Sequence, residues 1–152
     1  MNILNEVTIT FPSRSANESY ARAAVSAFAA QFDPTLEEIG DIKTAVSEAV
    51  TNCIVHAYPD CVGKIYIRLR ILENNTLEIV IRDRGLGIPD IEQAKTPMFT
   101  TGGEDRSGMG FTIMESFTDN LKIRSKPNGG TCLTMKKRIS MRSGGNMRDR
   151  HV

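Results

Sequence analysis

TLEEIGDIKTAVSEAVTNCIVHA, residues 35–57, is the pattern of one long amphipathic helix, and the rest of the fold can be predicted outward from it. Thr35 and Glu38 have the spacing of a capping box, in which each side chain accepts a hydrogen bond from the backbone N–H of the other residue. Apolar residues at helical spacing predict the stripe that packs on the core: Ile39, Ile42, Val46, Ala49, Val50 and Cys53. Because such a stripe must be covered, the helix predicts a second layer of structure.

The residues before this helix predict a strand and another helix. In the segment from Glu6 to Phe11, Val7, Ile9 and Phe11 alternate with two threonines, which is typical of a half-buried strand. Ser15 and Glu18 repeat the capping-box spacing and begin a predicted helix that runs to about Phe32. Its predicted core stripe is Ala21, Val25, Phe28, Ala29 and Phe32. The Asp33-Pro34 pair then separates the two helices.

The residues after the long helix predict mostly strands. Residues 65–72 and 77–82 flank an Asn74-Asn75 turn and indicate a hairpin. From Asp83 to about Gly110 the composition changes to Gly, Pro, Thr and Ser, which predicts a long irregular segment of a kind that is usually functional in compact domains. A short helix over 110–117 and strands over 121–125 and 131–137 complete the predicted elements.

Helices grouped early in the chain and strands paired by hairpins predict an α+β two-layer sandwich, with helices on one face of a mixed, mainly antiparallel sheet. With 152 residues, of which 40% are apolar, the chain can bury one core and is too short for two ordinary domains. We therefore expect one domain over residues 1–139 and a disordered basic tail over residues 140–152.

The charge and the hydropathy argue against several classes of protein. The formal net charge is +1, and without the predicted tail it would be −1 (16 basic and 17 acidic residues), so we expect no nucleic-acid binding. No apolar run approaches the ~20 residues of a membrane span, and the N-terminus lacks a basic-then-apolar signal, so we expect a cytoplasmic protein without membrane contact. Cys53, Cys61 and Cys132 form no CxxC pair, which disfavours both a disulfide framework and a zinc site.

Three polar residues, Glu48, Asn52 and His56, recur every four residues beside the apolar stripe of the long helix. Side chains with this spacing share one side of an α-helix. A solvated helix face would explain the pattern without any chemistry. The chemical interpretation makes Glu48 a general base, Asn52 an oxygen ligand for Mg²⁺, and His56 a neighbour of phosphate groups.

Glycine-rich motifs lie at both ends of the predicted irregular segment. DRGLG, residues 83–87, follows an apolar strand; a carboxylate there can accept a hydrogen bond from the amine of adenine, although such glycines often mark only a tight turn. RSGMGF, residues 106–111, precedes the short helix, where free backbone N–H groups and the helix dipole favour phosphate, although a plain loop-to-helix junction fits as well. Neither a P-loop nor a Rossmann fingerprint is present.

The order of these motifs resembles the GHKL ATPase superfamily over about residues 5–138: ExxxNxxxH on a helix, DxGxG after a strand, a lid, GxG before a helix, and Gly-Gly-Thr131 before the last strand. This resemblance implies the Bergerat ATP-binding fold. Four stretches narrow it to the anti-sigma F factor family (stage II sporulation protein AB): NESYAR at 17–22, SEAVTN at 47–52, PMFTT at 97–101 and RSGMGFTIME at 106–115. Gly102-Gly103 departs from the usual Lys-Pro of that family, so Arg106 becomes the expected cation of the lid.

The resemblance implies a protein serine/threonine kinase that uses ATP and Mg²⁺. It implies a sigma factor of the sigma F type as binding partner, a serine of an anti-anti-sigma factor as substrate, and a homodimer. Glu48 is the implied catalytic base, and Asn52 is the implied magnesium ligand. Arg22 faces away from its core stripe and is the predicted partner contact, although a solvated arginine would explain its position equally well. The implied nucleotide-binding residues are Asn52, His56, Asp83, Gly85, Gly87, Thr100, Thr101, Arg106, Ser107, Gly108, Met109, Gly110 and Thr131.

Other interpretations stay open at this point. A binding module, in which nucleotide only sets the affinity for a partner, would use the same pocket without turnover. A histidine-kinase catalytic domain would need a separate helical hairpin with an acceptor histidine, whereas the histidines of this chain are His56 and His151. A general-stress paralogue of the anti-sigma F factors is also compatible with the sequence.

Overall fold

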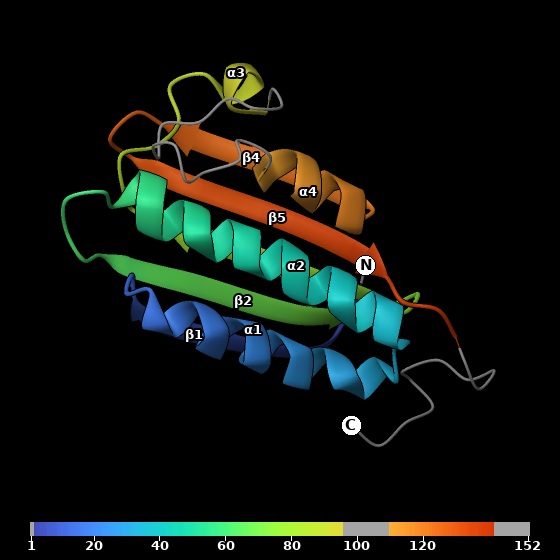
Figure 1. Cartoon of the computed structure of the whole chain (residues 1–152). Helices are drawn as coiled ribbons and strands as arrows, with labels where there is room; N and C mark the ends of the chain where they lie inside the picture. The colour runs from blue at the N-terminus through green and yellow to red at the C-terminus, as the bar shows by residue number, and fades with distance from the viewer. Residues whose placement is uncertain (1, 96–109, 142–152) are drawn as a thin grey trace.

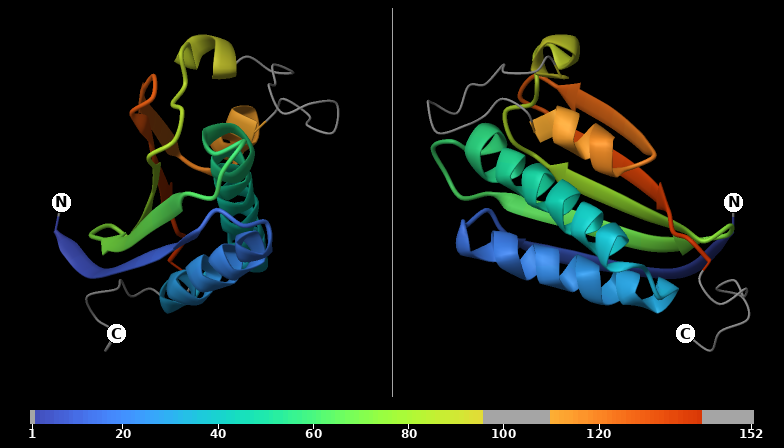
Figure 2. Two further views of the ribbon diagram at one scale, coloured as in Figure 1. Left: turned by 90° about the vertical axis from the view of Figure 1, so that its left-hand side faces the viewer. Right: turned by 45° about the vertical axis from the view of Figure 1, so that its right-hand side comes forward.

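The computed structural model contains one five-stranded sheet with helices on one of its faces (Figure 1). The structure describes residues 2–95 and 110–141. The strands are β1 (Ile3–Pro12), β2 (Lys64–Leu72), β3 (Thr76–Asp83), β4 (Asn120–Lys126) and β5 (Gly130–Arg138), in the spatial order β1-β2-β3-β5-β4. The helices are α1 (Ala16–Ala29), α2 (Leu36–Asn52), α3 (Ile91–Lys95) and α4 (Gly110–Phe117). The two layers are separate in the side view of Figure 2, which confirms the predicted α+β sandwich.

The sheet differs from the prediction in one respect. All four of its described strand pairings are antiparallel, so it lacks the parallel pairing that a mixed sheet would contain. The reason is that β5 lies between β3 and β4. The strands β3 and β4 run in the same direction, but each of them pairs with β5 instead of with the other.

The long helix begins as the sequence predicted. Thr35 Oγ1 accepts a hydrogen bond from Glu38 N at 3.0 Å, and Glu38 Oε1 accepts one from Thr35 N at 2.9 Å, which completes the capping box. The predicted stripe is buried except for Ile39, which is partly buried against the core. After Asn52 the chain continues as a π-helical turn over Cys53–Ala57, in which Tyr58 N donates to Cys53 O at 3.1 Å.

The capping box predicted for α1 is wrong, although the helix and its buried stripe are confirmed. Ser15 already has helical backbone angles, φ −54° and ψ −36°, and its side chain makes no cap hydrogen bond. A capping residue needs extended backbone angles for its side chain to reach the free N–H groups of the first turn. The helix ends in a 3₁₀ turn, Ala30–Phe32.

The hairpins follow from their turn residues. Asn74 and Asn75 lie in the three-residue turn between Leu72 and Thr76 and have φ of 63° and 55°, a left-handed conformation that asparagine adopts more readily than most residues. The helix and strands predicted near 110–117, 121–125 and 131–137 are confirmed as α4, β4 and β5. The prediction missed α3, which lies inside the segment expected to be irregular. Asp90 begins this helix, because its Oδ1 accepts from Gln93 N at 3.0 Å.

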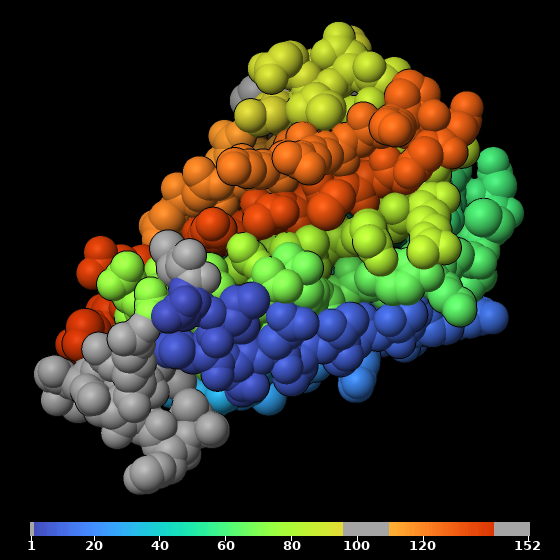
Figure 3. All heavy atoms as spheres, turned by 180° about the vertical axis from the view of Figure 1, so that it is seen from behind, coloured from blue at the N-terminus to red at the C-terminus, as the bar shows by residue number. Residues whose placement is uncertain are grey.

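Alternation along the strands divides the sheet into two faces. On β2 the side chains of Ile65, Ile67, Leu69 and Ile71 are buried under the helices, and the residues between them point to the other face. Figure 3 looks onto that other face, where the strands themselves form most of the surface. Within residues 2–95 and 110–141, no helix has both the length and the apolar character needed to span a membrane.

Candidate functional site

The C-terminal end of α2 brings three sequence motifs together. Cys53 Sγ donates a hydrogen bond to Asp83 Oδ2 at 3.5 Å, which joins the helix to the motif after β3. On Asn52, the preceding residue, the side chain lies beside the first residue of α4: a Cβ at Gly110 would be 3.3 Å from Asn52 Oδ1 and 3.4 Å from Glu48 Oε2. The motifs of residues 48–52, 83–87 and 110 therefore converge at this end of the helix.

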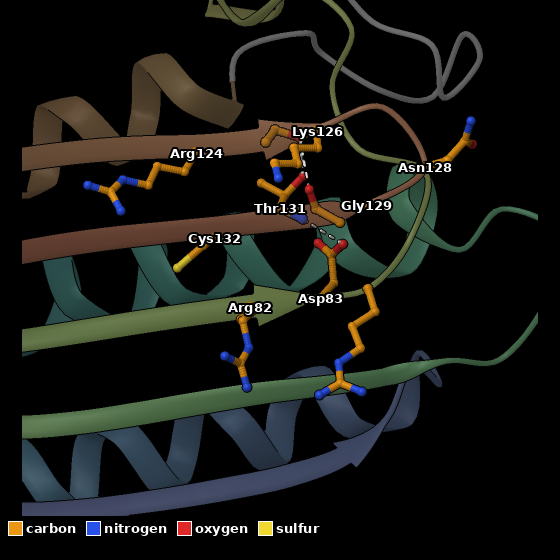
Figure 4. Close-up of a pocket in the computed structure, with 11 residues that line it drawn as sticks. Arg82, Asp83, Arg124, Lys126, Asn128, Gly129, Thr131 and Cys132 are labelled. Atoms are coloured by element: carbon orange, nitrogen blue, oxygen red, sulfur yellow. Dashed lines mark hydrogen bonds between the residues drawn. The ribbon is translucent and has the colours of Figure 1, made fainter.

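Asp83 is a buried carboxylate, 5% exposed, with its hydrogen bonds divided between its two oxygens. Its Oδ1 accepts from Gly85 N at 2.9 Å and from Thr131 N at 3.2 Å, and Figure 4 shows the side chain pointing toward Thr131. Burial raises the pKa of Asp83, and these hydrogen bonds oppose that effect. The structure thus brings together Asp83 and Thr131, two of the residues expected to bind nucleotide.

The glycines of the DRGLG motif are explained by close contacts of the backbone. A Cβ at Gly85 would lie 2.2 Å from the carbonyl oxygen of Ala57, to which Leu86 N donates at 3.0 Å. Gly87 has φ 77°, and a Cβ there would lie 2.0 Å from Lys126 O. The loop is thus held between the end of α2 and the β4–β5 turn, which fixes the position of Asp83.

Ser125 is a polar residue of this region that the sequence did not reveal. Its Oγ accepts from Ile88 N at 2.7 Å, donates to Gly130 O at 3.1 Å and lies 2.9 Å from Thr131 Oγ1. It joins the loop after β3 to the start of β5. A serine near a strand end has no local signal for such a role, because all of these partners come from other parts of the chain or across the turn.

Tyr58 is the second residue that sequence reasoning missed. Its hydroxyl donates to Lys64 O at 2.8 Å and accepts from Arg84 N at 2.7 Å. Burial raises the pKa of Tyr58, while the hydrogen bond from Arg84 lowers it. The neutral phenol therefore supports the backbone next to Asp83.

The remaining predicted site residues are His56 and six residues between α3 and α4. His56 lies in the π-helical turn, whose i→i+5 hydrogen bonding breaks the four-residue spacing that would align it with Glu48 and Asn52. The predicted residues Thr100, Thr101, Arg106, Ser107, Gly108 and Met109 lie outside the described residues.

Arg22 lies on α1, away from the buried stripe of that helix. Its side chain is 43% exposed and lies 3.6 Å from Glu18 Oε1, one helical turn earlier. An exposed pair of this kind contributes little to folding, so the guanidinium group is accessible from solvent.

Comparison with known proteins defines the class. Residues 11–137 match the family model of the histidine kinase-like ATPase domain. The structure of the RsbU and RsbW domains of a Mycobacterium tuberculosis protein shares the fold, with a TM-score of 0.66 at 21% identity over 90% of this chain and 32% of that one. The chain is therefore an ATPase-type domain of the GHKL class.

Similar sequences define the family more closely. The chain is 55% identical over 141 residues to the anti-sigma F factor of Caldanaerobacter subterraneus subsp. tengcongensis, which covers 91% of this chain and 97% of that protein. It is 51% identical over 138 residues to the anti-sigma F factor of Bacillus subtilis (strain 168), which covers 90% and 94%. The chain belongs to the anti-sigma F factor family, which confirms the resemblance seen in its motifs.

Proposed function

We propose that this chain binds and inhibits a sigma factor of the sigma F type, and that it uses ATP and Mg²⁺ to phosphorylate a serine of an anti-anti-sigma factor. The observation that carries the proposal is that three motifs meet at Asn52 and Cys53. The Cys53 thiol contacts the Asp83 carboxylate, and the Asn52 amide lies beside Gly110 at the start of α4. Membership of the GHKL class supports ATP as the nucleotide.

Asp83 would recognise the adenine base. Its Oδ1 is occupied by two backbone N–H groups, whereas Oδ2 accepts only from the Cys53 thiol among the described hydrogen bonds. A carboxylate oxygen has capacity for a second donor, and the exocyclic amine of adenine is such a donor. Gly85, Gly87 and Thr131 would line the base, and His56 would lie toward the phosphates.

Asn52 would hold the magnesium ion together with the phosphates of the nucleotide. Among the described residues no three His, Cys, Asp or Glu side chains are grouped to hold a metal, so a bound ion would depend on nucleotide oxygens. The donor fits, because Mg²⁺ takes amide and phosphate oxygens and keeps several waters. Glycine at position 110 avoids crowding this amide, because a Cβ there would lie only 3.3 Å from Asn52 Oδ1. When bound, the ion would neutralise charge on the transferred phosphoryl group.

Glu48 would accept the proton of the attacking serine hydroxyl. Its carboxylate lies on the same side of α2 as Asn52 and next to the start of α4, where a Cβ at Gly110 would lie 3.4 Å from Glu48 Oε2. Phosphoryl transfer depends mainly on positioning and charge neutralisation. A single carboxylate that accepts the hydroxyl proton is therefore enough as the general base. Removing it should slow transfer by about 10² to 10⁴-fold with little change in ATP affinity.

The partners follow from the family. The similar proteins are named anti-sigma F factors, which supports a sigma factor as the inhibited partner. Arg22 on α1 would contact this partner, because it is exposed and lies on the side away from the core. We also propose that the chain acts as a cytoplasmic homodimer, with the lid residues 100–110 completing the phosphate site.

Mass spectrometry of a candidate anti-anti-sigma protein tests this function. The partner is incubated with the chain, ATP and Mg²⁺, in parallel with the Glu48→Ala variant and with Glu37→Ala as a control from the exposed start of α2. We expect one acid-stable phosphoserine that is lost with Glu48→Ala and kept with Glu37→Ala. Tight ATP binding without any phosphate on the partner would contradict the kinase and favour a binding module gated by nucleotide.

A further inference from the structure

The open face of the sheet, opposite the helices, has basic side chains whose surroundings differ from one end to the other. At one end, neighbouring strands place Glu6, Arg70, Glu78 and Lys136 in one row. Arg70 Nε lies 2.6 Å from Glu6 Oε2, and Glu78 lies within 4.0 Å of Arg68, Arg70 and Lys136. The basic groups at this end are therefore neutralised.

The other end of the same face has no such neutralisation. Arg82, Arg84, Lys122, Arg124 and Lys126 are all exposed. None of them forms an ion pair with an acidic side chain among residues 2–95 and 110–141. We call these five residues the basic end of the sheet. Like charges so close together repel one another, and an anionic partner would remove that repulsion.

The basic end of the sheet surrounds a hollow, and an aromatic ring holds two of its side chains in place. A hollow of about 400 Å³ is lined by Arg82, Arg84, Arg124 and Lys126, together with the β4–β5 turn and the start of β5, and the buried Asp83 is the one acidic residue among the described residues that line it. In Figure 4 the Arg82 and Arg124 side chains extend on the face turned away from α2. The guanidinium carbons of Arg82 and Arg84 lie 5.1 and 5.3 Å from the centre of the Tyr66 ring, a cation–π arrangement that fixes them without neutralising their charge.

We propose that the basic end of the sheet binds an acidic segment of a partner protein. Several carboxylates on a short peptide would reach the four cations around the hollow and form charge-assisted hydrogen bonds with the arginines. A nucleic acid fits less well, because both arginines occupy the Tyr66 ring on which a base would stack, and because Glu6 and Glu78 border the other end.

This surface adjoins the base-binding part of the proposed nucleotide site, because Asp83 and Thr131 also line the hollow. The proposed catalytic and magnesium residues are separate from it: Glu48 and Asn52 lie on α2 in the helical layer, whereas Figure 4 shows Arg82 and Arg124 extending on the other face of the sheet. The acidic segment is held by the basic side chains, so its binding should not require ATP, and the inference does not rest on the proposed kinase activity.

Fluorescence anisotropy with the full chain tests this proposal. The probes are a labelled peptide of about ten Asp and Glu residues and a labelled single-stranded oligonucleotide of equal charge, both at low salt. The variant is Arg82→Glu with Arg124→Glu. The control is Arg14→Glu with Lys43→Glu, which makes the same change in net charge at exposed positions outside the open face. Thermal unfolding and ATP binding check that each variant is folded, and Arg82→Gln with Arg124→Gln replaces the first variant if it is not.

We expect the peptide to bind the unaltered chain, to lose about tenfold or more in affinity with the Arg82 and Arg124 variant, and to be nearly unaffected by the control. Failure of the peptide to bind, or an equal loss with both variants, would overturn the proposal. Tighter binding of the oligonucleotide than of the peptide, with the same loss, would also overturn it and assign the surface to nucleic acid.

Discussion

The carboxylate of Asp83 has a structural task as well as a proposed chemical one, and the two fall on different oxygens. Oδ1 satisfies two backbone N–H groups at the end of β3 and the start of β5. Oδ2 faces the Cys53 thiol. A substitution can therefore separate the support of the backbone from the recognition of nucleotide.

Asp83→Asn should weaken ATP binding by about 1.5 to 3 kcal/mol, the range for a hydrogen bond to a charged group. The fold should survive, because the amide oxygen can still accept from Gly85 and Thr131. Asp83→Ala should lose both ATP binding and thermal stability, because it leaves two buried N–H groups without an acceptor. Calorimetric titration with ATP and thermal unfolding of both variants measure the two effects. Unchanged ATP affinity in both would remove Asp83 from the nucleotide pocket.

Cys53 and Cys61 should differ strongly in reactivity. Cys53 is buried, and burial together with the charge of Asp83 raises the pKa of its thiol well above the usual value. Cys61 is exposed. Because the thiolate is the reactive form, iodoacetamide should modify Cys61 quickly and Cys53 only after unfolding. Peptide mass spectrometry over time measures both rates in one sample, and rapid modification of Cys53 in the folded chain would contradict its described burial.

At the scale of single elements, the long helix shows which local signals can be trusted. The same pattern, Ser or Thr followed three residues later by Glu, predicted a capping box at Thr35 and at Ser15, and only the first one forms. Thr35 has extended backbone angles, φ −71° and ψ 163°, whereas Ser15 is already helical. The backbone angle of the residue before a helix depends on how the preceding strand enters it, which a spacing rule does not contain.

Removal of the two side chains gives a matched comparison. Thr35→Ala should lower the free energy of unfolding by about 1 kcal/mol, because one backbone N–H of α2 loses its acceptor. Ser15→Ala should change it by much less, because the Ser15 side chain makes no cap hydrogen bond. Urea unfolding followed by circular dichroism measures both values, and equal losses would show that Ser15 caps α1 in solution.

Strands and helices could be predicted from the sequence because each depends on the spacing of nearby residues. The order of the strands and the placement of β5 between β3 and β4 could not, because they depend on how distant segments pack. The same limit applies to the site. Glu48, Asn52 and Asp83 stand in recognisable motifs, whereas Ser125 and Tyr58 act through partners that only the fold supplies.

On the scale of the whole molecule, the end of the sheet is tied back to the start of α2. Ser140 follows β5, and its N and Oγ donate to the Glu38 carboxylate at 2.8 and 3.1 Å. Glu38 therefore serves both the capping box and the chain after the last strand. The expected disordered tail stays a prediction for the residues after Met141, and Ser140 is held in place by this contact.

This shared carboxylate should make stability depend on pH. Burial acts to raise the pKa of Glu38, but hydrogen bonds from Thr35 and Ser140 outweigh it, so the pKa lies below its ordinary value of 4.5. A carboxylate whose pKa is lower in the folded chain stabilises the fold above the unfolded value, and this contribution is lost as the pH falls through the folded pKa.

The test compares the unaltered chain with Glu38→Gln. The unaltered chain should be the more stable of the two at neutral pH, and the difference should shrink as the pH falls below about 4.5. Urea unfolding at several pH values measures it, and Glu37→Gln controls for the loss of one negative charge from α2. A difference that does not change with pH would mean that the Glu38 carboxylate has no special partners in the folded state.

Although the chain is nearly neutral, its charge is distributed unevenly over the sheet, so one end of the open face has a positive potential. The formal net charge of the chain is only +1, yet uncompensated cations gather at one end of one face. At physiological salt the field of such a cluster extends about 8 Å into the solvent. This field would orient an acidic protein before contact. Because salt screens the field, added salt should lower the association rate much more than it raises the dissociation rate.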